Sequence, residues 1–215
     1  MISSRWFGRP VRSLSTRSSS LSSILQNPSL LPEVDRGRPT FEVRNPADPD
    51  SVVGKVSVMD RSAATKCIET SHEVLPSWRD GTTATERSRL LTEWARLIQE
   101  NKEDIATIMT MESGKPLQES RGEVTYGTSF LDFYAAEAVR PTGAGGGFLV
   151  PTPFAHAETG APRGQIMAMQ QAVGVTVSIT PWNFPLSMVR IIRGSLGSKP
   201  SGIAEDDTHH SALLS

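Results

Sequence analysis

The hexapeptide TPWNFP at residues 180–185 carries the residue types best suited to chemistry in this sequence. It lies between a stretch predicted to be a buried strand and one predicted to be a helix. Two prolines and a tryptophan make such a connection rigid, and open α/β sheets bind ligands at the carboxyl ends of their strands. Asn183 offers a side-chain N–H there to a bound group. The sequence therefore predicts a ligand site at this elbow, with capping of the following helix as the alternative role of Asn183.

Two glycine patterns resemble phosphate-binding loops but lack residues that such loops need. The run that begins at Gly143 starts like a dinucleotide-binding fingerprint, yet Phe148 stands where its last glycine belongs. Gly114-Lys115 is followed by Pro116, where a P-loop needs Ser or Thr to hold Mg²⁺. We therefore interpret the first pattern as a linker and the second as a helix end.

Cysteine and histidine give no further site. Cys67, the one cysteine of the chain, stands on a predicted helix without an adjacent base, which indicates a structural thiol and excludes an internal disulfide. An acidic and histidine-containing run at residues 206–210 lies in a polar tail with no element to fix its geometry. We predict no metal site.

Composition and charge narrow the classes of partner. With 215 residues and a net charge of −1, the chain lacks the basic character of a nucleic-acid-binding domain. No apolar stretch approaches the roughly 18 residues of a membrane span. Residues 1–32 contain no Asp or Glu but four arginines and many serines, which is typical of an organelle transit peptide. A disordered basic tail is the alternative.

The secondary structure around the elbow is predicted from the spacing of apolar residues and from residues that cap or terminate helices. Alternating residues predict a hairpin of 40–44 with 52–58. Caps and terminators predict helices over 60–75, ending at Pro76, then from Thr83 or Thr85 to Asn101, over 102–113 and over 117–139. In the second helix, five apolar residues share one face that we expect to be core: Leu90, Leu91, Trp94, Leu97 and Ile98.

The second half predicts the start of a parallel sheet. A glycine-rich and proline-rich loop over 143–162 is followed by apolar runs at 165–172 and 174–180. The latter run is rich in β-branched residues and free of charge, as in a strand that is buried on both faces. A helix is expected to begin near Pro185. The fold class is therefore α/β.

Several long blocks resemble the aldehyde dehydrogenase superfamily: ITPWNFP at 179–185, FEVRNPA at 41–47, LPSWR at 75–79 and MESGKPLQESRGEVTYGTSFLDFYAAEA at 111–138. The last block is most similar to that of mitochondrial succinate-semialdehyde dehydrogenases. The resemblance covers about residues 27–189. It implies the N-terminal part of that fold, with helices, the start of a Rossmann-like parallel sheet and bridging β-strands.

The resemblance also implies a chemistry. In the family a cysteine thiolate attacks the aldehyde, hydride passes to NAD or NADP, and a glutamate-activated water hydrolyses the thioester. Asn183 matches the catalytic asparagine whose N–H stabilises the oxyanion. The positions bordering the dinucleotide are Ile179, Thr180, Pro181 and Trp182. Semialdehyde enzymes hold the distal carboxylate with an arginine on the next helix. Ungapped matching places that position at Ile191, with Arg190 one residue before it and Arg193 two residues after it. A helix turns about 100° per residue, so either arginine needs a register shift to point there. Arg190 is the nearest candidate, with a solvated helix charge as the alternative.

The resemblance ends before the family's remaining catalytic residues. From Gly194 onward nothing matches the glycine loop, the glutamate base or the nucleophilic cysteine. We expect a truncated gene product with a transit peptide at 1–32, an incomplete dehydrogenase portion at 33–189 and an aberrant polar tail at 190–215. The function implied is oxidation of a small aldehyde, succinate semialdehyde, in the mitochondrial matrix by a homo-oligomeric enzyme, with this chain alone inactive. The alternative is a non-catalytic subunit that associates with full-length aldehyde dehydrogenase.

Overall fold

The computed structural model describes residues 21–31, 34, 37–141, 146–156, 158–161 and 164–189. Its helices are α1 (Arg61–Gly81), α2 (Ala84–Glu100), α3 (Lys102–Ser113) and α4 (Leu117–Val139). Two antiparallel two-stranded sheets join β1 (Thr40–Asn45) with β2 (Asp48–Ser57), and β3 (Gly147–Pro151) with β4 (Gln165–Met169). Two single 3₁₀ turns, η1 (Leu21–Ser23) and η2 (Pro28–Leu30), precede β1.

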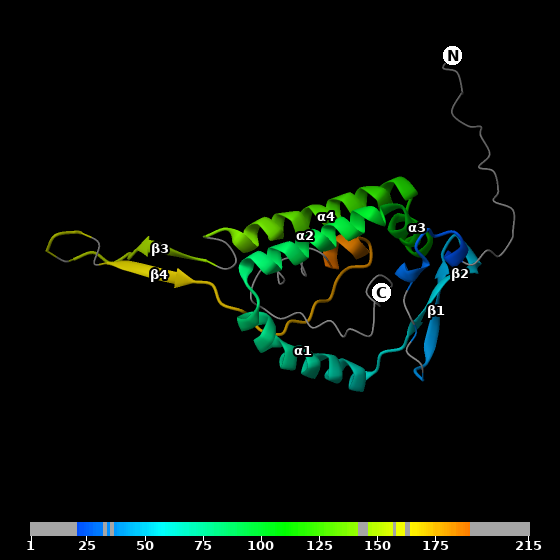
Figure 1. The fold of residues 1–215 in the computed structure, drawn as a ribbon, viewed down its shortest axis with the longest axis horizontal. Helices are drawn as coiled ribbons and strands as arrows, with labels where there is room; N and C mark the ends of the chain where they lie inside the picture. Colours follow the sequence, from blue (N-terminus) through cyan, green and yellow to red (C-terminus); the bar gives the residue numbers. More distant parts are fainter. Residues whose placement is uncertain are drawn as a thin grey trace, which may run out of the picture.

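The elements are arranged around the pair formed by α2 and α4, which run side by side (Figure 1). The β1–β2 hairpin lies beside α3 at one end of this pair. The β3–β4 hairpin projects from the opposite end. Within the described residues, the structure has no helix that is both long and apolar enough to cross a bilayer.

Local capping explains where the helices begin and end. The Asp60 carboxylate accepts the Ala63 N–H at 2.8 Å, and the Thr83 hydroxyl accepts the Glu86 N–H at 3.1 Å. Gly114 ends α3 in the left-handed conformation, with φ of 75°. The predicted bounds of α2, α3 and α4 are confirmed.

The prediction that the first helix ends at Pro76 is wrong, because α1 continues to Gly81. A proline inside a helix removes one N–H and leaves the carbonyl four residues earlier without its usual donor. Here that carbonyl belongs to His72, which is exposed, so water can hydrogen-bond to it. The cost of the interruption is therefore small enough for the helix to persist.

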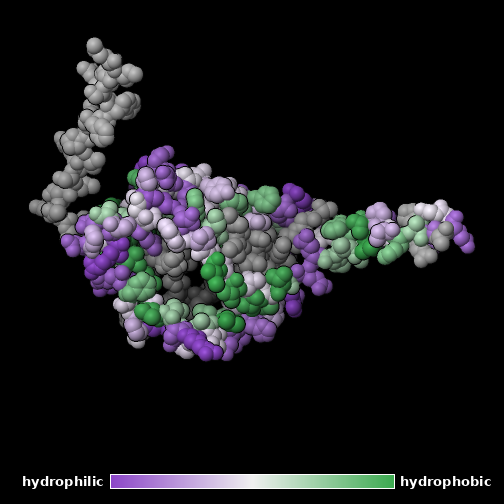
Figure 2. Space-filling view, turned by 180° about the vertical axis from the view of Figure 1, so that it is seen from behind, coloured by the Kyte–Doolittle hydropathy of each residue, from purple (hydrophilic) through white to green (hydrophobic). Residues whose placement is uncertain are grey.

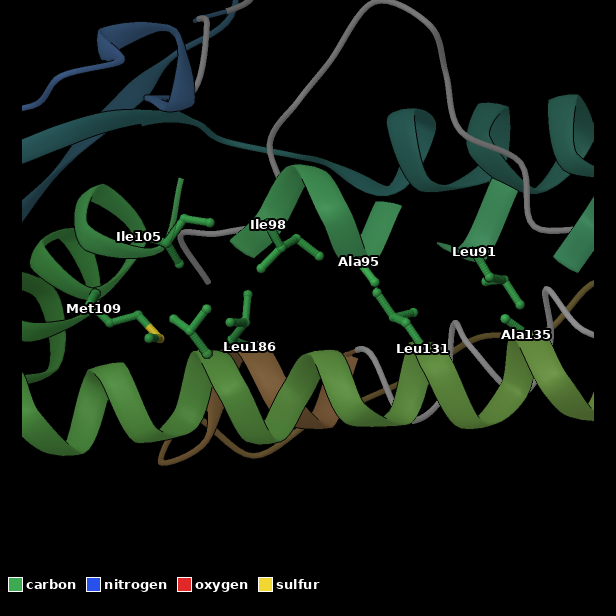
Figure 3. Packing of buried hydrophobic residues seen from close by; sticks show 10 residues of the cluster. Leu91, Ala95, Ile98, Ile105, Met109, Leu131, Ala135 and Leu186 are labelled. Carbon is green, nitrogen blue, oxygen red and sulfur yellow. The ribbon is translucent and has the colours of Figure 1, made fainter. Parts of the chain in front are cut away.

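The main core lies between α2, α3 and α4. Figure 3 shows its side chains meeting from these helices and from Leu186, which follows the elbow. On α2 the buried hydrophobic residues are Leu91, Ala95 and Ile98, whereas Leu90 and Leu97, predicted as core, are 38% and 44% exposed. Each lies one position before a buried residue and so points about 100° away from it. The contact face of α2 is thus narrower than predicted, and includes Ala95.

The strands depart from prediction at two places. The hairpin over 40–58 is confirmed, but residues 147–151, predicted as loop, form β3 and pair with β4. Gly147 is needed there, because a Cβ would lie 2.6 Å from the carbonyl oxygen of Ala168. The loop prediction failed because flanking glycines and prolines outweighed a short apolar run.

The predicted buried parallel strand at 174–180 does not form in this structure. This stretch pairs with no strand among the described residues, and Val177 and Ile179 are 77% and 94% exposed. A parallel strand needs a neighbouring strand for its backbone hydrogen bonds and cover on both faces. The described residues provide neither. The helix expected after it does begin, at residues 185–189, and the overall class remains mixed α and β.

Candidate functional site

The elbow, residues 179–185, presents most of the predicted site residues on the surface. Pro181 and Asn183 are exposed, Thr180 is half-buried, and Ile179 and Trp182 are 94% and 77% exposed. The residues predicted to border a dinucleotide and the predicted oxyanion donor therefore lie on one short, accessible segment. Arg190, the predicted carboxylate ligand, lies outside the described residues.

Lys115 connects the elbow to the start of α4. This lysine follows Gly114, whose left-handed conformation turns the chain between α3 and α4. Its Nζ donates to the backbone carbonyl of Asn183 at 2.9 Å and lies 5.2 Å from the centroid of the Phe184 ring, within cation–π range. The backbone of Asn183 is thus held by a charged donor.

Glu123 on α4 completes the attachment. One of its carboxylate oxygens, Oε2, accepts a short hydrogen bond from Lys115 Nζ. The other, Oε1, accepts the backbone N–H groups of Leu186 at 2.9 Å and Ser187 at 3.3 Å. These are the first amides of the helix that begins at Pro185, where a negative charge is favoured by the helix dipole.

The pair is buried well enough to fix geometry. The side chains of Glu123 and Lys115 are 2% and 14% exposed, and Leu186 and Ser187 beside them are buried. A buried carboxylate needs its charge and lone pairs satisfied, and Glu123 receives three donors. We call Lys115, Glu123 and their contacts to residues 183–187 the elbow clamp. It fixes the backbone of the elbow while the Asn183 residue stays accessible.

Sequence reasoning missed both residues of the elbow clamp. The residues around Lys115 predict only a helix end, and the pattern around Glu123 predicts no role in a site. A signal existed for Glu123, because it shares the buried face of α4 with Ser120, Val124 and Gly127 at helical spacing. A carboxylate on such a face indicates a partner. The identity of that partner, 63 residues later in the chain, had no local signal.

The remaining sequence motifs lie outside the hydrophobic core or outside the described residues. Cys67 is exposed on α1, so it does not pack in the core as a structural thiol would. The acidic and histidine run at 206–210 lies outside the described residues. Among the residues that are described, no group of three potential metal ligands comes together.

Glu112 on α3 gives a testable pH dependence. Burial raises the pKa of its carboxyl from the usual 4.5 to about 7. The native chain therefore holds this proton more tightly than the unfolded chain, so stability falls as pH rises from about 4.5 to about 7. Because the carboxyl is partly exposed, solvent screening reduces the effect of its pKa shift on stability. We therefore expect E112Q to be more stable than the parent by roughly 1–2 kcal/mol at about pH 8 and equal to it at about pH 4.

Urea unfolding of both chains across this pH range measures the difference. Glu119→Gln, at an exposed position on α4, is the matched control and should leave the pH profile unchanged. Parallel stability curves for E112Q and the parent would contradict the assignment.

Comparison with known proteins places the described segment in a family. The model of the aldehyde dehydrogenase family matches residues 34–191. A glutarate-semialdehyde dehydrogenase of Pseudomonas putida is 40% identical over 157 residues, which are 73% of this chain and 30% of that protein. A mitochondrial succinate-semialdehyde dehydrogenase of Oryza sativa is 38% identical over 150 residues, covering 70% of this chain and 26% of the relative.

A solved structure agrees with these relatives. Succinate-semialdehyde dehydrogenase from Burkholderia pseudomallei superimposes with a TM-score of 0.69 at 32% identity, covering 88% of this chain and 39% of the other. The chain spans less than a third of the length of the two curated relatives. The match nevertheless includes β1, β2, α1 to α4 and the elbow. The chain belongs to the aldehyde dehydrogenase family.

Proposed function

We propose that the protein to which this segment belongs oxidises succinate semialdehyde to succinate, with NAD or NADP as the hydride acceptor. The observation that carries the proposal is the elbow, in which an exposed Asn183 has its backbone fixed by Lys115 and Glu123. An accessible amide donor on a rigid backbone is what stabilisation of an oxyanion requires. The relatives described as semialdehyde dehydrogenases support the substrate class.

In this proposal the elbow has two tasks. The Asn183 side-chain N–H donates to the aldehyde oxygen as it becomes negatively charged. The residues before it border the dinucleotide, whose nicotinamide accepts the hydride when it is bound. Ile179 and Trp182 fit this role because they expose apolar side chains that a flat aromatic group can cover. Arg190 is proposed to hold the distal carboxylate of the semialdehyde, which a guanidinium binds with two parallel hydrogen bonds.

We propose the mitochondrial matrix as the location of this protein. The acid-free, arginine-containing segment at residues 1–32 supports this location, as does similarity to a plant enzyme described as mitochondrial. Small-molecule aldehyde and dinucleotide are the proposed partners.

The assay that tests the proposal uses the longest product of the gene and, beside it, the 215-residue chain. Each is incubated with succinate semialdehyde and with NAD or NADP, and reduced nucleotide is followed by absorbance. We expect turnover by the longer product and none by the 215-residue chain. Faster turnover of glutarate semialdehyde than of succinate semialdehyde would overturn the assignment of the substrate. Absence of turnover with every aldehyde would overturn the whole proposal.

A second candidate is a non-catalytic subunit that associates with full-length aldehyde dehydrogenase, and the β3–β4 hairpin favours it. This hairpin carries side chains that are 45% to 69% exposed, including Phe148, Leu149, Met167 and Met169. Figure 2 shows hydrophobic surface on this projecting hairpin. An apolar surface on a projecting element is typical of a protein interface. Size-exclusion chromatography with light scattering of the chain mixed with full-length aldehyde dehydrogenase tests this, and separate elution of the two proteins would count against it.

A further inference from the structure

The segment of residues 21–31, which we call the N-terminal strap, belongs to the folded domain although its composition matches a leader. Leu21 and Leu25 are 2% and 7% exposed. They form a second hydrophobic cluster with Val53 of β2 and Ile108 of α3, each 2% exposed. The strap thereby fills the junction between the β1–β2 hairpin and the helices.

Polar contacts fix the strap on α3. The Asp104 carboxylate, in the first turn of that helix and 7% exposed, accepts the backbone N–H groups of Gln26 at 3.0 Å and Asn27 at 2.6 Å. The Asn27 side-chain amide donates to Asn101 Oδ1 at 3.0 Å. Asp104 thus accepts two backbone donors from the strap. Loss of the strap would leave a largely buried carboxylate without these two donors.

The strap backbone is also folded on itself. The N–H groups of Ile24 and Leu25 both donate to the Leu21 carbonyl, at 2.9 and 3.2 Å. Leu31 N–H donates to the Pro28 carbonyl at 3.1 Å. A cut inside the strap would remove these turns and the buried leucines from the chain before the mature domain folds.

We propose that leader processing cuts the chain amino-terminal to Leu21, so that the strap stays on the mature protein. The step is hydrolysis of one peptide bond by a processing peptidase of the organelle. Water adds across the bond, giving a carboxylate on the released leader and an amine on the mature chain. The inference rests on the matrix location given under Proposed function, and it moves the processing boundary from residue 32 to before residue 21.

Import into isolated mitochondria followed by amino-terminal sequencing tests the cut. We expect the matrix product to begin at or before Leu21 and to retain the whole strap. A product that begins between residues 22 and 33, or import without cleavage, would overturn the inference while leaving the location intact. Absence of import would refute the location and the inference with it.

Deletion variants test the strap without import. Removal of residues 1–20 should change the Tm by no more than about 2 °C, whereas removal of residues 1–32 should lower it by about 10 °C or more, because two buried leucines are lost. Equal Tm values for the two deletions would overturn the inference.

A matched pair of point variants tests the packing of the strap if the longer deletion variant is insoluble. Leu25→Ala should lower the Tm by about 5–10 °C, since Leu25 is buried, whereas Ile24→Ala should change it little, since the adjacent Ile24 is 53% exposed. Equal effects of the two substitutions would show that the strap is not packed, and would overturn the inference.

Discussion

Replacement of Glu123 by alanine is expected to destabilise the chain by about 3–5 kcal/mol, the range for removing one partner of a buried ion pair. Two consequences combine in this loss. Lys115, with a side chain that is 14% exposed, loses its carboxylate partner. The backbone N–H groups of Leu186 and Ser187, both buried, lose the acceptor that Glu123 provides.

Urea unfolding measures this loss, and hydrogen exchange locates it. The amides of Leu186 and Ser187 should lose protection in the alanine variant. Asp132→Ala, at an exposed position on the same helix, is the matched control, with an expected change within about 0.5 kcal/mol. A loss below about 1 kcal/mol for E123A would contradict the role of the elbow clamp.

Double substitution separates the charge from the contact. Replacing Lys115 and Glu123 together by Met and Leu should restore much of the stability, because an apolar pair of similar volume is often as stable as a buried ion pair. The amides of Leu186 and Ser187 would still lack their acceptor. We therefore expect the double variant to lie between E123A and the parent chain.

Asn183→Ala is expected to lower kcat by about 10²–10³-fold in the longest active product of the gene, with a smaller change in KM. The reason is that an oxyanion donor acts on charge that exists mainly in the transition state. Because Asn183 is exposed and its clamp contact uses the backbone carbonyl, the substitution should leave stability within about 0.5 kcal/mol of the parent.

Steady-state kinetics with succinate semialdehyde and NAD or NADP give both constants. Gln171→Ala replaces another exposed amide outside the elbow and should retain the parent kcat. An equal fall in stability and kcat would indicate a structural role for Asn183. An unchanged kcat would remove it from the proposed mechanism.

Short-range chemistry encodes parts of the fold, and these parts could be predicted from the residues alone. The caps at Asp60 and Thr83 and the stop at Gly114 act within one helical turn, so the bounds of α2, α3 and α4 could be predicted. The elbow was likewise evident from its own residues. Family membership followed from uninterrupted blocks that need no three-dimensional information.

Contacts between distant segments became known from the tertiary structure alone. Composition assigned the strap to the leader, yet packing against Val53 and Ile108 makes Leu21 and Leu25 core residues. The buried face of α4 marked Glu123, but its partners lie on another segment. Strand formation also depends on distant segments. Residues 147–151 pair with β4, whereas residues 174–180 pair with no strand among the described residues. Hydrogen bonds and burial between segments depend on where the chain returns, and local residue patterns do not carry that information.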